Sequence, residues 1–461
     1  MPADGSKRSA SERNWQEDNL KYYRSLNSSM STFFRITFLW FAIICFILSA
    51  CSSASTSSIQ DPGETVTIRW RTRTDTQAEQ EMYQQINDRL NEQLMTQGIQ
   101  LVFDPVPSLS YLRQINTEIS QGNAPDIFWI PAQSIPEYAG KEMILDLRRL
   151  VRRDHQFELD DFYAAPLEEL QQGDGLWGLP RDISTLVMYY NKDLFQKYGL
   201  EDPAELAARG EWTCDNFRRL AIELTHPEER IYGFGMTVWW ATWGWFVYSH
   251  GGNFFNQERT ACALTDPVSQ QGLQFLADLY QKDKVGRPPG SSGGGGETVF
   301  LNGLIGMLPN GRWFTPGLRK NAHFNWGVVE MPNCGQLSSW MFWGAYVINA
   351  RAQKPEQAWI VLKALTASDV QAQAASLGTA IPSIKDKAAV DAFLSSKPPE
   401  DNQPFLNSAG YAQPEMALFT GSWGEIVDGQ YQPYIISILT GNSSVESATQ
   451  TACQGADPLF K

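Results

Sequence analysis

Strand and helix patterns alternate along residues 65–130, and this alternation limits the fold more than any other feature of the sequence. Residues 65–72 alternate apolar and basic side chains, which is the pattern of a half-buried strand. Residues 77–96 then carry an apolar side chain at every fourth position, so a helix there has one buried stripe. Three further segments extend the series as a strand, a helix and a strand: 101–103, 112–119 and 126–130. Such a series predicts a parallel sheet that is covered by helices.

The alternation continues further along the chain. We expect four more elements: a helix from Pro136 to 145–147, a strand at 186–191, and helices at 192–199 and from Trp212 onward. The four consecutive glycines at 293–296 favour a mobile surface loop. Because they lack the Gly-Lys-Ser/Thr ending of a phosphate-binding loop, they predict no nucleotide site.

The apolar run Ile36–Leu48 has the pattern of a secretion signal. It is shorter than the roughly 20 residues that a spanning helix needs, and a basic residue precedes it. Leu48-Ser49-Ala50-Cys51 resembles the box that bacterial lipoprotein signal peptidase cuts. We therefore predict a signal segment at 1–50, with Met30 as a candidate start, a lipid on Cys51 and a flexible tether over 51–63. A single-pass anchor with a chance cysteine behind it is the alternative.

Charge and length restrict the part of the chain after residue 50. Its net charge is −16, because the first 50 residues hold 6 of the 37 basic and 4 of the 51 acidic side chains. An acidic surface repels phosphate backbones, so we expect no nucleic-acid partner. The apolar stretch Trp239–Val247 is too short to span a membrane, and this part should be soluble. Its length exceeds the roughly 250–300 residues at which one core stops growing, which predicts two lobes.

Four cysteines remain after Cys51, and their spacing is wide. They form no CxxC pair and have no histidine cluster nearby, so a zinc site is not expected. Outside the cytoplasm they allow one or two disulfides. The sequence leaves the pairing open among Cys214, Cys262, Cys334 and Cys453.

Short blocks follow one another in a fixed order along the chain: Gly122–Ile127, Leu179-Pro180 with Met188–Phe195, Trp212–Phe217, His250–Gly252, Phe300–Met307 with Gly311–Trp313, and Gly344–Asn349. In this order they resemble the family 1 extracellular solute-binding proteins, the sugar-binding components of ABC importers, whose best-known member is maltose-binding protein. The resemblance covers nearly all of the chain after the signal. Many relatives have an aromatic residue at the position of Cys214. We interpret Cys214 as a packed thiol, which puts its part in a disulfide in doubt.

The resemblance implies an α/β, two-lobed periplasmic-binding-protein fold of type II, with a hinge and a cleft between the lobes. By analogy, the first lobe holds 64–181 and 344–381, and the second holds 182–343 and 382–461. The hinge would lie where the chain crosses near Pro180, Trp343 and Pro382. The implied function is capture of a sugar, polyol or glycoside for an ABC permease with cytoplasmic ATPase subunits. No cofactor or metal is implied, and we expect a monomer held at the membrane by its lipid.

Aromatic side chains are abundant enough to build a sugar site. Of the 16 tryptophans, only Trp15 and Trp40 lie in the predicted signal segment. Pyranose faces carry C–H groups that pack on aromatic rings. The resemblance makes Trp313 the first candidate for stacking and Trp240 the second. Six more tryptophans follow predicted strands or cluster with these two, and each is a candidate contact or a core residue: Trp129, Trp239, Trp243, Trp245, Trp340 and Trp343.

Polar candidates come from the same comparison with the family. Ser184 falls near a position where maltose-binding protein has a cleft carboxylate, and Asp182 precedes it on the same strand face. Carboxylates are strong acceptors for sugar hydroxyls, so a serine there argues for a different sugar. Loop positions after the first and third strands add Arg73, Asp75 and Gln133, and Arg312 adjoins Trp313. Tyr190, Asn191 and Lys192 fit a structural strand-to-helix corner better than a contact role.

Two other classes of function remain open on the sequence. A secreted glycoside hydrolase or lyase also joins aromatic platforms to carboxylates, and a hydrolase needs two carboxylates roughly 5 to 10 Å apart. The histidines are scattered and no Gly-x-Ser-x-Gly elbow is present. The second class is a surface receptor or adhesion lipoprotein that works without a transporter.

Overall fold

The computed structural model describes residues 65–460 apart from 75, 172–174, 292–293 and 415–422. These described residues form one compact unit. The predicted signal segment, the lipid on Cys51 and the tether lie outside the described residues.

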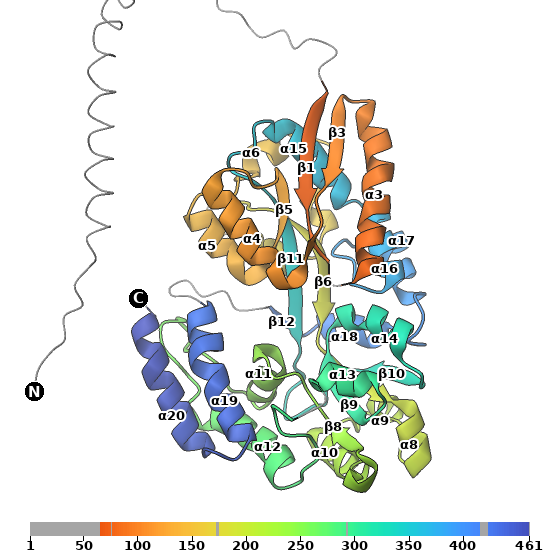
Figure 1. Ribbon diagram of the computed structural model, residues 1–461, viewed down its shortest axis with the longest axis vertical. Helices are drawn as coiled ribbons and strands as arrows, with labels where there is room; N and C mark the ends of the chain where they lie inside the picture. The colour runs from red at the N-terminus through yellow and green to blue at the C-terminus, as the bar shows by residue number, and fades with distance from the viewer. Residues whose placement is uncertain (1–64, 75, 172–174, 292–293, 415–422, 461) are drawn as a thin grey trace, which may run out of the picture. The chain divides into compact units, whose positions relative to one another are not determined.

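A six-stranded sheet holds the first strands of the chain (Figure 1). Its members are β1 (Val66–Arg71), β3 (Ile99–Phe103), β5 (Ile127–Pro131), β6 (Leu179–Thr185), β11 (Trp340–Ile348) and β12 (Gln413–Pro414). The order is β12-β11-β5-β1-β3, with β6 also paired to β11. The strand β1 is parallel to both β3 and β5. The parallel sheet predicted from the alternation is therefore confirmed, and β11 joins it antiparallel.

The first two long helices form because their ends are capped and one face is apolar. Helix α3 (Gln77–Met95) begins where the Thr76 side chain accepts a hydrogen bond from the Glu79 N–H, and Met82, Ile86 and Leu90 are buried along it. Helix α4 (Ser108–Gln121) ends at Gly122, whose φ of 76° is the left-handed conformation that glycine adopts readily.

A second, four-stranded sheet has the order β10-β7-β9-β8. Its strands are β7 (Val187–Asn191), β8 (Tyr232–Phe234), β9 (Ile305–Asn310) and β10 (Trp326–Val329). The strand β7 is fully buried, and Asn191 at its end caps helix α8 (Lys192–Tyr198) by accepting from the Leu194 N–H. The corner role expected for Tyr190–Lys192 agrees with this geometry.

The other helices pack around the two sheets or, as α19 and α20 do, against other helices (Figure 1). They are α5 (Ile135–Gly140), α6 (Arg148–Arg153), α7 (Ala164–Leu170), α9 (Pro203–Ala208), α10 (Cys214–Glu223), α11 (Trp240–Ser249), α12 (Pro267–Gln281), α13 (Gly296–Leu301), α14 (Thr315–Asn321), α15 (Pro355–Leu365), α16 (Ser368–Leu377), α17 (Lys387–Leu394), α18 (Gln403–Ala409), α19 (Gln432–Leu439) and α20 (Val445–Ala456). A π-helix, η5 (Gly424–Tyr431), precedes α19, and two short strands, β2 (Arg73–Thr74) and β4 (Val106–Pro107), pair with each other. None of the described helices is long and apolar enough to cross a membrane.

Two element predictions need correction. The helix expected to reach 145–147 ends at Gly140, because the chain beyond it turns to add Ile144 as a β-bridge beside Asn349. The run 293–296 is not wholly a surface loop, since Gly296 is buried and opens helix α13. A Cβ on Gly296 would lie 2.6 Å from the Met236 carbonyl carbon, so only glycine fits this close approach.

Three segments carry the chain between the two sheets. The strands β6 and β11 pair antiparallel along most of their length, and Ile183 of β6 exchanges two backbone hydrogen bonds with Ile381. Along β11, Trp343 belongs to one cluster of buried apolar residues and Phe342 to the other. The crossings predicted near Pro180, Trp343 and Pro382 thus lie side by side. The lobe boundaries drawn through them remain a prediction.

Two disulfides join the four cysteines. One links Cys214, at the start of α10, to Cys334 after β10, which corrects the interpretation of Cys214 as a packed thiol. Backbone hydrogen bonds between these segments, from the Cys214 N–H to the Asn333 carbonyl, bring the two cysteines together.

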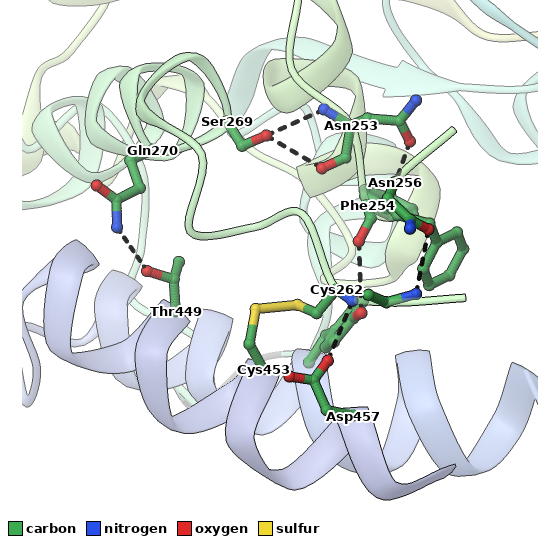
Figure 2. The surroundings of a disulfide bond; sticks show 12 residues. Asn253, Phe254, Asn256, Cys262, Ser269, Gln270, Thr449, Cys453 and Asp457 are labelled. Carbon is green, nitrogen blue, oxygen red and sulfur yellow. Dashed lines mark hydrogen bonds between the residues drawn. A yellow bond between two sulfur atoms is a disulfide. The ribbon is translucent and has the colours of Figure 1, made fainter. Parts of the chain in front are cut away.

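The other disulfide joins Cys262 to Cys453 on α20 (Figure 2). The Cys262 N–H also donates to Asp457 at 3.2 Å, and Gln270 of α12 donates to Thr449 at 2.9 Å. Because the bonded cysteines are 191 residues apart, this bond fixes the C-terminal helix to a distant part of the chain.

Candidate functional site

A cavity of about 580 Å³ lies between the two sheets, beside the crossing strands β6 and β11. The side of the first sheet supplies Arg73 on β2, Glu79 on α3, Trp129 and Pro131 on β5, and Gln133 just after β5. The crossing strands supply Arg181, Asp182, Ser184, Phe342, Trp343 and Gly344, with Thr379 and Ala380 next to them. The side of the second sheet supplies Thr237, Trp239, Trp240, Glu297, Asn310 and Trp313.

The wall on the side of the second sheet is aromatic. The Trp239 ring stacks on Phe342 at 5.4 Å between centroids, and the Trp313 ring meets the same Phe342 edge-on at 5.0 Å. Trp239 and Trp313 are both partly exposed, whereas Trp240, whose ring lies 5.3 Å from that of Trp239, is 6% exposed. These two rings can therefore offer apolar surface to a ligand.

Local backbone geometry holds this aromatic wall in place. Trp239 is the N-cap of α11, and the Thr242 hydroxyl in the first turn donates to the Thr237 carbonyl at 2.6 Å. The Trp313 ring folds back over Gly311, where a Cβ would lie 2.2 Å from ring carbons. Gly311 is in turn fixed by Tyr189, whose hydroxyl donates to its carbonyl oxygen at 3.0 Å.

The opposite wall is built around Trp129, in the middle of β5. The guanidinium groups of Arg73 and Arg181 lie over the Trp129 ring at 5.0 and 5.2 Å. The Trp129 N–H of the backbone donates to the Tyr111 hydroxyl at 3.0 Å. A Cβ on Gly344 would lie 2.1 Å from Nε1 of Trp129, so the indole occupies space that only a glycine leaves open.

A β-bulge brings two charged residues to the cavity. Asp182 pairs with Gly344 and Pro180 pairs with Ala345, so Arg181 is an extra residue that has no partner on β11. A bulge changes the direction of side chains that would otherwise alternate. Both Arg181 and Asp182 consequently line the cavity, and their side chains form an ion pair at 2.7 Å.

Arg181 is held in its charged form. Its Nη1 donates to the Thr72 hydroxyl at 2.7 Å. Burial by itself lowers the pKa of Arg181, but Asp182 and the nearby Tyr83 and Tyr346 outweigh it, and the pKa lies well above its usual range. On the other wall, the Glu297 carboxylate accepts from the Asn310 side chain at 2.8 Å.

Nine of the residues predicted for the site line this cavity: Arg73, Trp129, Gln133, Asp182, Ser184, Trp239, Trp240, Trp313 and Trp343. Asp75 lies outside the described residues. Trp245 and Trp340 are buried core residues, which is the alternative interpretation of each. Among the predicted contacts, Trp243 and Arg312 do not line the cavity.

Packing explains the two corrections. Trp243 is one helical turn beyond Trp240, is fully buried and packs on Phe254 at 4.6 Å. Arg312 points away from Trp313 and is also fully buried, with its guanidinium 4.9 Å from the centroids of both Phe393 and Phe405. Burial lowers the pKa of Arg312 to about 9. Its role is to join η4 (Arg312–Phe314) to helices α17 and α18.

Ten lining residues were not predicted: Glu79, Pro131, Arg181, Thr237, Glu297, Asn310, Phe342, Gly344, Thr379 and Ala380. Sequence signals existed for two of them. Glu79 stands three residues after Thr76, which is the spacing of a capping box at the start of a predicted helix, and Glu297 directly follows the glycine run. The others depend on strand pairing that the sequence does not display.

Only one group of possible metal ligands is close together among the described residues. It comprises His226, Glu228 and Glu229, which do not line the cavity. His226 stacks on Tyr198 at 4.0 Å and Glu229 pairs with Lys197, so these side chains already have partners.

Comparisons with known proteins agree with this geometry. The family model for bacterial extracellular solute-binding proteins matches residues 76–372, which is more than half of the chain. A binding protein of Brucella abortus is 24% identical over 381 residues, covering 79% of this chain and 86% of the relative. The galactooligosaccharide-binding protein of Bacillus subtilis is 22% identical, covering 55% of this chain and 58% of the relative.

Among solved structures, an ABC substrate-binding protein from Listeria monocytogenes in complex with cycloalternan has the same fold. The TM-score is 0.78 at 21% identity, and the match covers 86% of this chain and 99% of that one. The family and these relatives are binding proteins, so the comparisons give the glycosidase alternative no support.

Proposed function

Because this chain belongs to the family of bacterial extracellular solute-binding proteins, we propose that it captures a sugar, or a related polyol or glycoside, for an ABC permease in the membrane. One observation carries the proposal: the cavity beside β6 and β11 combines two partly exposed indole rings with carboxylate acceptors drawn from both of its walls. The permease would be driven by ATPase subunits in the cytoplasm.

The chemistry of the cavity suits a carbohydrate. Trp239 and Trp313 provide planar apolar surface for the C–H faces of a pyranose. Asp182 and Glu297 provide charged acceptors, which form the stronger hydrogen bonds to hydroxyl groups. The names of relatives that bind a galactooligosaccharide and cycloalternan support an oligosaccharide as the substrate class.

Capture would depend on a change in the angle between the lobes. The three crossing segments near Pro180, Trp343 and Pro382 lie together and can bend as one hinge. A ligand that contacts both walls stabilises the closed form in proportion to the extra contacts it makes there. The lobes we propose are 64–181 with 344–381, and 182–343 with 382–461.

The family name places the protein outside the cytoplasm. We propose further that a lipid on Cys51 anchors it to the membrane and that it acts as a monomer. Metabolic labelling with a fatty acid, compared between the wild type and Cys51→Ser, tests the anchor. Equal label in both proteins would contradict it.

Titration calorimetry of the purified chain from residue 52 onward tests the substrate class. The panel contains maltose, maltotetraose, galactobiose, tagatose and erythritol. We expect saturable heat with at least one sugar and quenching or enhancement of tryptophan fluorescence at the same concentration. The absence of heat with every member of the panel would contradict a sugar substrate, and the release of new reducing ends would favour a hydrolase.

A further inference from the structure

Four buried side-chain atoms on residues that line the cavity have no hydrogen-bond partner among the described residues, and one of them, Nε of Arg181, forms an ion pair with Asp182 at 2.7 Å. The other three are Nε1 of Trp129, Nε1 of Trp343 and Oε1 of Gln133. A buried donor or acceptor left in this state destabilises the protein, because the loss of its contact with water is not offset, and native proteins leave few of them. Three such buried atoms on residues that line one cavity require an explanation.

The three atoms come from neighbouring parts of one sheet. Trp129 lies on β5, and Gln133 follows that strand in η1 (Ala132–Ser134). The strand β11 pairs with β5 so that Gly344 faces Pro131, which places Trp343 beside the end of β5. The unpartnered atoms therefore belong to cavity-lining residues from neighbouring parts of one sheet.

The rings on this wall are not available for stacking. Trp129 and Trp343 are 6% and 4% exposed, and two guanidinium groups already lie over the Trp129 ring. A buried indole still has its N–H to offer. The stacking surface is on the opposite wall, where Trp239 and Trp313 are partly exposed.

The charges around the cavity favour a neutral ligand. Its lining holds two cations, Arg73 and Arg181, and three carboxylates, Glu79, Asp182 and Glu297. Arg181 is already paired with Asp182 at 2.7 Å. The lining thus has one more negative than positive group, and a phosphorylated ligand would be repelled.

We propose that Trp129, Trp343 and Gln133 form a hydrogen-bonding subsite that reads the hydroxyl groups of a neutral sugar. The two indole N–H groups donate to ligand oxygens, and the Gln133 amide oxygen accepts from a hydroxyl. Trp239 and Trp313 stack on the sugar from the other side. The inference rests on the proposed function and assigns different roles to tryptophans of one cavity.

The test compares Trp129→Phe and Trp343→Phe with the stacking variant Trp313→Ala. Phenylalanine keeps an aromatic ring but removes the N–H. Calorimetry is carried out with maltose, galactobiose and tagatose, and with the monodeoxy analogues of whichever sugar binds the wild type. Each Trp→Phe variant should weaken the parent sugar about 3- to 10-fold, which corresponds to one hydrogen bond. It should leave unchanged the affinity for the one analogue that lacks the partner hydroxyl.

The control distinguishes recognition from packing. Trp313→Ala should weaken the parent and every analogue by the same factor, because stacking does not depend on one hydroxyl. If Trp129→Phe and Trp343→Phe also weaken all analogues equally, or weaken none, the subsite is refuted. Should either variant fail to fold, Gln133→Leu at the partly exposed position 133 gives the same comparison for the acceptor.

A separate titration tests the inference that the ligand carries no charge. Glycerol 3-phosphate and glucose 6-phosphate should give no heat with the wild type at concentrations that saturate the neutral sugar. Binding of either phosphate more tightly than the neutral sugars would overturn the neutral-ligand inference while the proposed transport role stands. No heat with any sugar or phosphate would instead overturn the proposed function and the subsite with it.

Discussion

Substituting alanine for Gly344 should disturb the cavity at the edge of the Trp129 ring. An alanine Cβ would lie 2.1 Å from Nε1 and 2.3 Å from Cε2 of Trp129. Both separations are far shorter than the roughly 3.5–4.0 Å of van der Waals contact, so the ring has to move. Trp129 is 6% exposed and lies under Arg73 and Arg181, so it has little room to do so.

The size of the effect follows from this crowding. Extra volume in a packed core costs about 1–3 kcal/mol, and we expect Gly344→Ala to lower the free energy of unfolding by this amount. Sugar affinity should fall as well, because Trp129 and Arg181 line the same cavity. Urea denaturation followed by circular dichroism measures the first effect, and titration calorimetry with the panel sugar measures the second.

Two variants serve as controls for Gly344→Ala. A Cβ added to Gly317, which lies in α14, would have no atom within 4 Å, so Gly317→Ala should preserve stability or raise it by about 0.5–1 kcal/mol. In the double variant Gly344→Ala/Trp129→Phe, the smaller phenylalanine ring has no Nε1 to meet the alanine Cβ. The losses of unfolding free energy caused by the two substitutions should therefore be less than additive. Unfolding and binding of Gly344→Ala that match the wild type would refute the reasoning.

Three further predictions follow from the packing. Trp313→Ala should weaken sugar binding at least about tenfold with little change in the free energy of unfolding. Trp243→Ala should instead leave a cavity in the core and lower the free energy of unfolding by about 3–5 kcal/mol. Calorimetry and urea denaturation separate the two effects, and equal effects of the two variants would contradict the assignment of Trp313 to the site and Trp243 to the core. Cys453→Ser should lower the free energy of unfolding by about 2–5 kcal/mol, because the disulfide to Cys262 closes a long loop. Equal urea midpoints for the oxidised and the reduced wild-type protein would contradict this prediction. Burial raises the pKa of Asp104, but hydrogen bonds from Arg71 and Arg69 outweigh burial, so the pKa is lowered. The stabilisation that ionised Asp104 gives the folded state is therefore present at neutral pH and lost as the pH falls below about 4. Asp104→Asn should be less stable than the wild type at pH 7 and lose less stability on acidification, which urea denaturation at pH 7 and at acidic pH measures.

Much of the first sheet could be predicted because its signal is local. The periodicity of residues 77–96 reports a buried stripe, and the structure forms α3 over Gln77–Met95. The strands at 65–72 and 126–130 appear as β1 and β5, parallel to each other. The predicted helix from Pro136 is too long, since Ile144 forms a bridge to the distant Asn349 instead of continuing the helix. Local periodicity cannot distinguish these two uses of an apolar run.

The site was less predictable because burial decides which tryptophans face the cavity. Trp240 and Trp243 belong to one cluster in the sequence, but only Trp240 lines the cavity. Trp243 is one turn further along α11 and meets Phe254. Likewise, Arg312 and Trp313 are adjacent, and a 3₁₀ turn sends their side chains to opposite sides. Residue type gave the chemistry of the site, whereas tertiary packing selected its members.

The residues missed on the crossing strands have a shared physical cause. Regular alternation along β6 would direct Arg181 and Asp182 to opposite faces of the sheet, and the sequence offers no sign of an extra residue there. The pairing with β11 shifts by one residue between Gly344 and Ala345, so both charged side chains reach the cavity. Gly344 then leaves the space that Trp129 fills. The bulge in β6, Gly344 and the Trp129 indole therefore depend on one another. For this reason Arg181 and Asp182 can be assigned together to the cavity wall only once the pairing of β6 with β11 is known.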